Sequence, residues 1–155
     1  MFCPFCGTFQ VTVTNSRPTL GGSQIWRRRK CLKCGETFTT YERINLSHLI
    51  IIKKSGQRQR YNRAKLYSGI YRSSIDRKNL DKGAIGVFAE EATNKVEREI
   101  VKLKRKKIHS TEITEIVLKI LEKKAPDTLL RFLAYREGDD TKKLKSLLKK
   151  HLKNI

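Results

Sequence analysis

The chain carries the same short cysteine motif twice, as Cys3-Pro-Phe-Cys6-Gly7 and as Cys31-Leu-Lys-Cys34-Gly35. In a C-x-x-C-G motif a tight turn directs two thiolates at one point, and the glycine supplies the backbone freedom that this turn needs. Two such motifs, separated by residues 7–30, match the ligand set of a tetrahedral four-cysteine zinc site. Because all four ligands are thiolates, no position is left for water or substrate. The sequence therefore predicts a structural Zn²⁺ bound by Cys3, Cys6, Cys31 and Cys34.

Paired cysteines also occur as redox dithiols and as disulfides. A thioredoxin-like dithiol has a single C-x-x-C beside a βαβ unit, whereas this motif is duplicated with its glycine. A signal peptide is not expected, since the first motif begins at residue 3, and the longest aliphatic run, Leu49–Ile52, is too short to span a bilayer. The sequence favours zinc in a reduced, cytoplasmic compartment, with no membrane association.

Size and charge suggest two units and a polyanionic partner. The 155 residues include 35 Lys and Arg against 15 Asp and Glu, a formal net charge of +20. Such an excess argues for nucleic acid as the partner, although it says nothing about the fold. The first 49 residues can bury little core, so zinc would supply folding free energy on the order of 10 kcal/mol. We expect domains at 1–48 and 49–139, and a Lys-rich helix or tail at 140–155.

The first domain has the alternation of short β-strands. Val11–Thr14, Ile25–Lys30 and Thr37–Glu42 predict three strands, with Gly21-Gly22-Ser23 as a turn. Three strands with a zinc site at one end form a zinc ribbon. Alternate side chains of a strand face opposite ways, so Arg27 and Arg29 should share one face while Arg28 and Lys30 share the other.

The basic run on the second of these strands has two interpretations. It is either a solvated edge that prevents aggregation or a phosphate-binding patch, and its single sign beside a rigid metal site favours phosphate binding. Trp26 either stacks on a base or fills a small core, and core filling is the commoner role. The predicted patch consists of Arg17, Arg27, Arg28, Arg29, Lys30 and Lys33.

From Leu49 the pattern predicts a mainly helical domain that opens with a β-hairpin. A strand to Lys54, a two-residue turn at Ser55-Gly56 and a strand Gln57–Tyr61 form the hairpin. Asn62 should cap the first of four helices, Ser110 or Thr111 the third, and Ala125-Pro126-Asp127 should start the fourth. A Lys-rich amphipathic helix is expected from Thr141. The fold class is therefore α+β. The apolar stripes of the four helices are the predicted core: Ala64, Leu66, Tyr67, Ile70, Tyr71, Ile85, Phe88, Ala92, Val96, Ile100, Ile113, Ile116, Val117, Ile120, Leu121, Leu129, Leu130, Phe132 and Leu133.

These motifs, in this order, resemble a known family. The CPFCG motif, Asn15-Ser16-Arg17, the Arg-rich strand, the second CxxCG motif and Phe38-Thr-Thr-Tyr-Glu42 resemble the NrdR family, bacterial repressors of ribonucleotide reductase genes. Lys53-Lys54-Ser55-Gly56 and Tyr61-Asn-Arg-Ala-Lys-Leu66 resemble the ATP-cone, the nucleotide-sensing module that those repressors share with the reductases. The chain departs from the family pattern at Asn15 (usually Asp), Trp26 (usually Arg) and Gln59-Arg60 (usually Glu-Pro).

The resemblance implies a nucleotide-responsive repressor in the bacterial cytoplasm, associated with the nucleoid when bound to DNA, and not an enzyme. Its ribbon would bind double-stranded operator DNA of ribonucleotide reductase genes through the predicted patch. Its cone would bind ATP or dATP and thereby change the homo-oligomeric state. Cations beside a helix N-terminus also suit a triphosphate on physical grounds. The implied nucleotide contacts are Lys53, Lys54, Asn62, Lys65 and Ser110.

Other classes of protein account for part of the sequence. A zinc-ribbon protein that binds RNA or the ribosome, without nucleotide regulation, explains the cysteines and the charge and is the main alternative. A zinc deaminase is excluded because no H-x-E motif begins at His48, His109 or His151, and a reductase barrel does not fit into 155 residues. Hydrolysis of the nucleotide is not expected because the chain has no G-x-x-x-x-G-K-[ST] loop.

Overall fold

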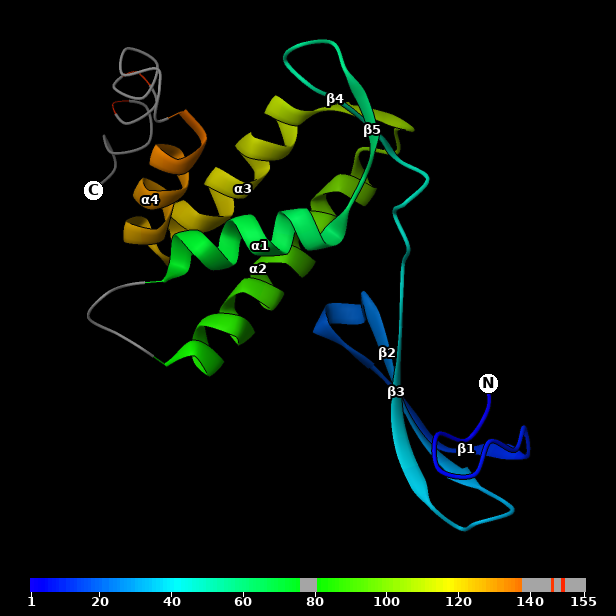
Figure 1. Cartoon of the computed structure of the whole chain (residues 1–155). Helices are drawn as coiled ribbons and strands as arrows, with labels where there is room; N and C mark the ends of the chain where they lie inside the picture. The colour runs from blue at the N-terminus through cyan, green and yellow to red at the C-terminus, as the bar shows by residue number, and fades with distance from the viewer. Residues whose placement is uncertain (76–80, 138–145, 147–148, 150–155) are drawn as a thin grey trace. The chain divides into compact units, whose positions relative to one another are not determined.

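A computed structural model describes residues 1–75 and 81–137 of the chain, together with positions 146 and 149. The chain divides into two compact units, Met1–Asn45 and Leu46–Ile155, and each has its own small sheet (Figure 1). Among the described residues, no helix is both long enough and apolar enough to cross a membrane.

The first unit is an antiparallel three-stranded ribbon. Its strands are β1 (Val11–Thr19), β2 (Gln24–Cys31) and β3 (Thr37–Arg43), in the order β1-β2-β3, and a 3₁₀ turn, η1 (Leu20–Gly22), joins the first two. The predicted three-stranded ribbon is confirmed, although β1 continues well past its predicted end at Thr14. A bulge between Val13 and Asn15 bends β1, and Pro18 is accommodated because β1 is an edge strand.

The second unit packs four helices against a second three-stranded sheet, which lies at one end of the helices (Figure 1). β4 (Ile50–Ile52) pairs antiparallel with β5 (Arg58–Arg60) and parallel with β6 (Lys107–His109), so β4 is central. The predicted α+β class with an N-terminal hairpin is confirmed. The third strand, β6, is not predicted by the sequence pattern. The helices are α1 (Arg63–Ser74), α2 (Lys82–Lys102), α3 (Ser110–Lys124) and α4 (Pro126–Glu137).

The hairpin between β4 and β5 is shorter in its strands and longer in its loop than expected. The Gly56 N–H donates to the Lys53 carbonyl at 2.9 Å, and the Lys53 N–H donates to the Gln57 carbonyl at 2.9 Å. The loop therefore contains residues 54–56 rather than Ser55-Gly56 alone. Gly56 has φ +80°, the left-handed conformation that ends a three-residue hairpin loop.

Side chains cap the helices close to the predicted positions. The Asn62 side-chain oxygen accepts from the Lys65 N–H at 3.2 Å, which confirms the cap of α1. The cap of α3 was expected at Ser110 or Thr111, but the helix begins at Ser110 and His109 occupies the cap position. There the Glu112 carboxylate accepts from the His109 N–H at 3.2 Å.

One hydrophobic core holds the second unit together. It includes, buried or partly buried, the predicted core positions except Ala64, which is exposed, and Ile85, which lies outside the cluster. It adds Leu49 and Ile51 from the region of β4. Ile108, the single apolar residue of β6, is fully buried among them. The amphipathic helix predicted from Thr141 lies outside the described residues, apart from positions 146 and 149.

Candidate metal centre and ligand-binding surfaces

The two cysteine motifs bring four sulfur atoms to one point at the end of the ribbon. All four lie within 4.8 Å of one another, with Sγ–Sγ distances of 3.7 Å between Cys3 and Cys34 and 3.6 Å between Cys6 and Cys31. A disulfide requires about 2.05 Å, so these are free thiols. Four sulfurs at about 2.3 Å from a zinc ion would be about 3.8 Å apart. The spacing fits tetrahedral Zn²⁺, with no place for a further ligand.

The two motifs fold in the same way. The N–H groups of Gly7 and Gly35 donate to the carbonyls of Cys3 and Cys31, at 2.9 and 3.1 Å, and both glycines have positive φ. The Cys34 N–H also donates to the Cys31 Sγ at 3.4 Å. This hydrogen bond lowers the pKa of the Cys31 thiol to about 6. The lowered pKa favours the thiolate at Cys31, the form that binds a metal, whereas burial and the contacts with the other three thiols raise the pKa of Cys34 to about 12.

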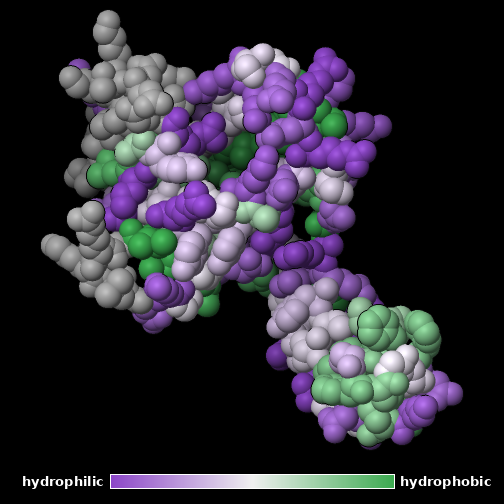
Figure 2. Space-filling view, in the orientation of Figure 1, coloured by the Kyte–Doolittle hydropathy of each residue, from purple (hydrophilic) through white to green (hydrophobic). Residues whose placement is uncertain are grey.

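The surface around the cysteines is hydrophobic. Figure 2 shows hydrophobic side chains gathered at the end of the ribbon. Phe2 and Phe9 pack edge to face at 6.4 Å, and each has more than half of its surface exposed. Leu32, in the second motif, is 67% exposed.

Cross-strand pairing divides the side chains of the ribbon between two faces. Residues directly opposite one another in an antiparallel sheet share a face. Arg17, Trp26 and Tyr41 form one row across the three strands, and the row of Arg28 lies on the same side. We call this surface the Trp26 face; it consists of Thr12, Asn15, Arg17, Thr19, Gln24, Trp26, Arg28, Lys30, Thr37, Thr39, Tyr41 and Arg43.

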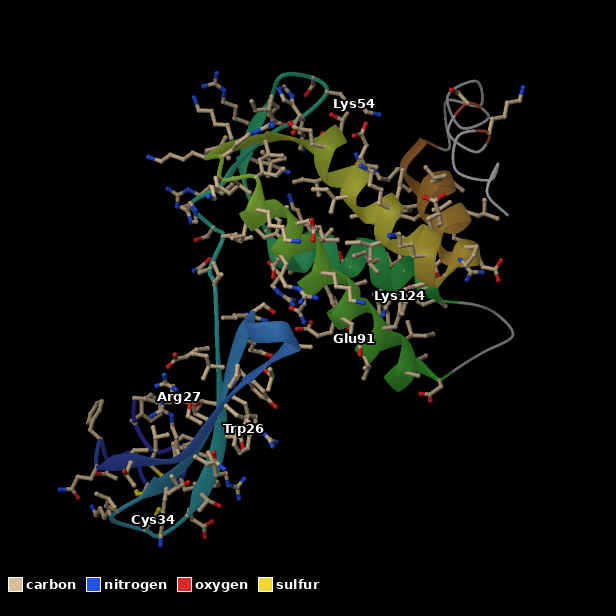
Figure 3. The ribbon with its side chains drawn as sticks, turned by 180° about the vertical axis from the view of Figure 1, so that it is seen from behind. Trp26, Arg27, Cys34, Lys54, Glu91 and Lys124 are labelled. Carbon is tan, nitrogen blue, oxygen red and sulfur yellow. The ribbon has the colours of Figure 1, made fainter. Side chains whose placement is uncertain are left out.

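The predicted phosphate-binding patch is split by this arrangement. Arg17, Arg28 and Lys30 lie on the Trp26 face and are exposed, whereas Arg27 and Arg29 lie half-buried on the opposite face. Figure 3 shows Trp26 and Arg27 on opposite sides of the strand. Lys33 is exposed in the second cysteine motif, outside the sheet. The alternation predicted for residues 27–30 is thus confirmed, and the six cations do not share one surface.

The arginines of the opposite face make contacts within the ribbon. Arg27 forms an ion pair with Glu42 at 3.0 Å, and the Arg29 Nε donates to the Thr40 hydroxyl at 2.9 Å. Phe38 lies opposite Arg29 and packs edge to face on Phe5 at 6.5 Å. These contacts tie β2 to β3, so Arg27 and Arg29 hold the ribbon together.

In the second unit, three of the five predicted nucleotide contacts line one small pocket. Asn62 and Lys65 come from the start of α1, and Ser110 is the first residue of α3. The volume of the pocket is about 190 Å³, below the range of about 300–1,000 Å³ usual for drug-sized ligands. It therefore suits one part of a nucleotide. Its remaining lining residues are Ile51, Gln59, Tyr61, Leu66, Gly69, Ile113, Phe132, Tyr135 and Arg136.

The other two predicted contacts lie at one end of the small sheet. Ile52, the last residue of β4, pairs with His109, the last residue of β6. Because this pairing is parallel, Lys53 and Lys54 leave the sheet at the end where α3 begins. Figure 3 shows Lys54 on the hairpin loop. The two lysines do not line the pocket, but they lie beside its Ser110 end.

The aromatic lining of this pocket was missed by sequence reasoning. Tyr61 closes the hairpin, while Phe132 and Tyr135 come from α4, far along the chain. Their helical spacing marked α4 only as a core helix. Tyr135 is 63% exposed although it lies on the same helix as the buried Phe132 and Leu133, and no sequence pattern marks it as a pocket residue.

A larger hollow of about 690 Å³ lies between α2 and α3 and contains none of the predicted nucleotide contacts. Its rim is basic: Lys124 contacts Lys95 and lowers the pKa of that amine. Lys124 also approaches Glu91 at 3.7 Å, as Figure 3 shows. Among the described residues, no aromatic side chain lines this hollow, so it lacks a surface on which an adenine could stack. The smaller pocket is therefore the better candidate for a nucleotide.

A four-thiol ribbon followed by this arrangement of helices and hairpin defines a zinc-ribbon protein with an ATP-cone. Two family models match the chain: "Transcriptional repressor NrdR-like, N-terminal domain" over residues 1–42 and "ATP cone domain" over residues 49–141. The chain belongs to the NrdR family.

Relatives named "Transcriptional repressor NrdR" align over nearly the whole chain. The protein from Thermoanaerobacter sp. (strain X514) is 36% identical over 99% of this chain and 94% of its own length. The protein from Lachnoclostridium phytofermentans is 37% identical over 98% and 97%, and that from Cupriavidus metallidurans is 36% identical over 96% and 93%. The family resemblance of the sequence is thereby confirmed.

Two departures from the family pattern are adjacent in the structure. Asn15 pairs with Arg28, and Trp26 pairs with Arg17, so both departures lie on the Trp26 face. An Asp at position 15 would place a carboxylate opposite Arg28, and an Arg at position 26 would add a cation beside it. The two replacements offset one another in charge and put an aromatic ring at the centre of the surface.

Proposed function

We propose that this protein is a transcriptional repressor that binds operator DNA of ribonucleotide reductase genes and responds to ATP or dATP. The proposal depends on the presence of a zinc ribbon and an ATP-cone in one chain. The chain aligns over nearly its whole length with relatives that are named transcriptional repressors. In this proposal the protein acts in the bacterial cytoplasm, bound to the nucleoid, and is not an enzyme.

The ribbon supplies the DNA-binding surface of the repressor. The Trp26 face carries four exposed cations, Arg17, Arg28, Lys30 and Arg43, and no carboxylate, so it offers positive charge to a phosphate backbone. Lys33 extends the charge towards the metal site. Zinc fixes the ends of β2 and β3 and thereby holds these cations in a rigid array. We assign the DNA contacts to Arg17, Arg28, Lys30 and Lys33.

The cone supplies the nucleotide site. An adenine base fits the small pocket, where Tyr61, Phe132 and Tyr135 provide aromatic surface and Asn62 provides a polar edge. The phosphates extend to the Ser110 end, where Lys53, Lys54 and the N–H groups of the first turn of α3 favour anions. Lys65, whose amine donates to Gln59 at 3.4 Å, lies between the two parts. This placement uses all five residues that the family resemblance implies.

Nucleotide binding acts on DNA binding through the oligomer. A single small ribbon covers few base pairs, so tight binding requires two or more linked copies. A nucleotide shifts the assembly only by binding one oligomer more tightly than another, and a difference of about 1–3 kcal/mol changes occupancy roughly 5- to 150-fold. ATP and dATP would thus select homo-oligomers that present ribbons at different spacings.

The proposal is tested by light scattering coupled to size-exclusion chromatography of the zinc-loaded protein without nucleotide, with ATP and with dATP. Binding to a labelled duplex from upstream of a ribonucleotide reductase gene is measured under the same three conditions. We expect the mass and the duplex affinity to change together with the nucleotide. If the protein binds structured RNA more tightly than this duplex, and its mass does not change with nucleotide, it is instead a zinc-ribbon RNA-binding protein without nucleotide regulation.

A further inference from the structure

In the row Arg17–Trp26–Tyr41, the guanidinium group of Arg17 lies over the indole ring of Trp26 at the surface of the ribbon. Arg17 and Trp26 are paired across β1 and β2, and the Arg17 guanidinium carbon lies 4.5 Å from the centre of the Trp26 ring. This is the distance of a cation–π contact. Tyr41, on the other side of Trp26, is 58% exposed. The aromatic side chains are thus at the surface and not in a core between layers.

The contact between Arg17 and Trp26 limits the freedom of the Arg17 side chain. A free arginine on a sheet surface samples many rotamers, and ordering it costs binding free energy. A guanidinium held against an indole ring keeps its orientation, while its N–H groups remain able to make two parallel hydrogen bonds. Arg28 is also ordered, by donating to the hydroxyls of Thr37 at 2.6 Å and Thr39 at 3.4 Å. Those hydroxyls occupy one N–H on each terminal nitrogen of Arg28, whereas the contact with the Trp26 ring uses none of the N–H groups of Arg17.

We propose that Arg17 reads a guanine in the major groove of the operator and that Trp26 is the positioning residue that sets its plane. A guanine presents O6 and N7 as a pair of acceptors, and bidentate arginine is their commonest partner. A β-ribbon is narrow enough to enter the major groove. Arg28 and Lys30, one and two rows away on the same face, then contact phosphates. This inference rests on the proposed function, because it requires that the ribbon binds duplex DNA.

The proposal separates the two roles of the cations on the Trp26 face, which come from β1 and β2. Arg17 determines sequence, while Arg28 and Lys30 determine affinity without regard to sequence. Arg27 and Arg29 do neither, because strand alternation places them on the opposite face, where they contact Glu42 and Thr40. Arg17→Lys is the sharpest variant, since it keeps the charge and removes the planar pair of donors.

The experiment selects binding sites from random-sequence duplexes with the full-length, zinc-loaded protein in the presence of ATP or dATP. Wild type, Arg17→Lys, Trp26→Ala, Trp26→Phe and the control Arg29→Lys are compared, after zinc content and circular dichroism confirm the fold. We expect Arg17→Lys to lose discrimination at one G·C pair by roughly 5- to 150-fold while the salt dependence of binding is unchanged. Trp26→Ala should weaken the same preference, and Trp26→Phe should restore most of it. Arg29→Lys should keep the preference.

Fluorescence provides a second measurement, because Trp26 is the single tryptophan of the chain. Its emission should change when the selected duplex binds. The proposal is overturned if Arg17→Lys keeps every base preference of the wild type or if Trp26 emission does not respond to the duplex. In both of those cases the wild type still selects a sequence, so the proposed function stands. A wild type that selects no sequence contradicts the proposed function itself.

Discussion

The phenolic hydroxyl of Tyr61 donates a hydrogen bond to Glu97 at 3.0 Å, and this joins the end of the hairpin to the C-terminal half of α2. The second carboxylate oxygen of Glu97 accepts from Arg63 Nε at 3.2 Å. Tyr61 also lines the small pocket of the cone. A ligand in this pocket therefore contacts a residue that is hydrogen-bonded to the longest helix of the unit.

Replacing Tyr61 by Phe removes this hydrogen bond and keeps the ring in the core. Hydrogen bonds to a charged group contribute about 1.5–3 kcal/mol, and Glu97 keeps Arg63 as a partner. We expect the free energy of unfolding to fall by about 1.5 kcal/mol, measured by urea denaturation followed by helical circular dichroism. An unchanged free energy of unfolding would show that water replaces the phenol without cost.

Stability should also depend on pH through Tyr61. Burial, and then the negative charge of Glu97, raise the pKa of this phenol above its usual value of about 10. The unfolded state therefore loses the proton first, so the stabilisation is complete below pH 10 and is lost as the pH rises above it. The free energy of unfolding should fall more steeply between pH 9 and pH 11 in wild type than in Tyr61→Phe. The other four tyrosines are common to both proteins, so equal slopes would contradict the assignment to Tyr61.

Removing Arg63 should lower the free energy of unfolding of the cone more than removing an exposed cation. Its guanidinium pairs with Glu90 at 2.7 Å and Glu97 at 3.2 Å, and its side chain is only 18% exposed. Arg63→Ala leaves Glu97, which is 14% exposed, without its charged partner, and we expect a loss of about 3 kcal/mol. The control is Lys102→Ala, whose partner Glu99 is well exposed; here the loss should be below about 1 kcal/mol. Equal losses in both variants would show that burial does not strengthen the Arg63 pairs.

The sequence predicts those elements whose signal is local. The cysteine motifs, the ribbon strands and the apolar stripes of the four helices repeat at fixed spacing, and the cap at Asn62 depends on a side chain three residues from its partner. β6 was missed because it offers a single apolar residue, Ile108, between polar neighbours, and it exists only through its pairing with the distant β4. The loop of residues 54–56 was misjudged because a Gly in the left-handed conformation ends three-residue loops as well as two-residue turns.

The candidate sites divide in the same way. The metal site follows from the spacing of four residues, and the structure brings their thiols together. The split of the basic patch follows from strand alternation for residues 27–30, but the place of Arg17 depends on the bulge near Asn15, which the sequence does not reveal. The aromatic side of the nucleotide pocket requires α4 to pack beside α1, and no local pattern contains that information.

Removing zinc should unfold the ribbon and spare the helices. The described core of the second unit contains no residue before Leu46, so it does not depend on the metal site. Cys31→Ser, or a strong chelator, should abolish duplex binding while helical circular dichroism is retained. Metal analysis of freshly reduced wild type should give close to one equivalent of zinc. Less than half an equivalent, or loss of the helical signal with the metal, would contradict this division.

Lys53 tests the nucleotide site. Lys53→Ala removes one cation at the Ser110 end of the pocket. We expect nucleotide affinity to fall at least tenfold, so the change in mass should need at least tenfold more nucleotide. Zinc content and weak, nonspecific DNA binding should remain. Lys107→Ala is the matched control, since it removes the same charge at the opposite end of the small sheet, where Lys107 pairs with Ile50. A variant that loses nucleotide binding but represses like wild type would show that the cone no longer acts as a sensor.

The parallel pairing of β4 and β6 sets an order of events during synthesis on the ribosome. The ribbon can bind zinc and fold as soon as Cys34 and β3 have emerged. The cone cannot, because its central strand lacks one neighbour until α1, α2 and β6 have followed, and long-range pairing is slow to form. Until then Ile50–Ile52 presents an open, apolar strand edge to other nascent chains. Translation that stops within α2 would therefore release a folded zinc ribbon attached to an aggregation-prone fragment, with the nucleotide site incomplete.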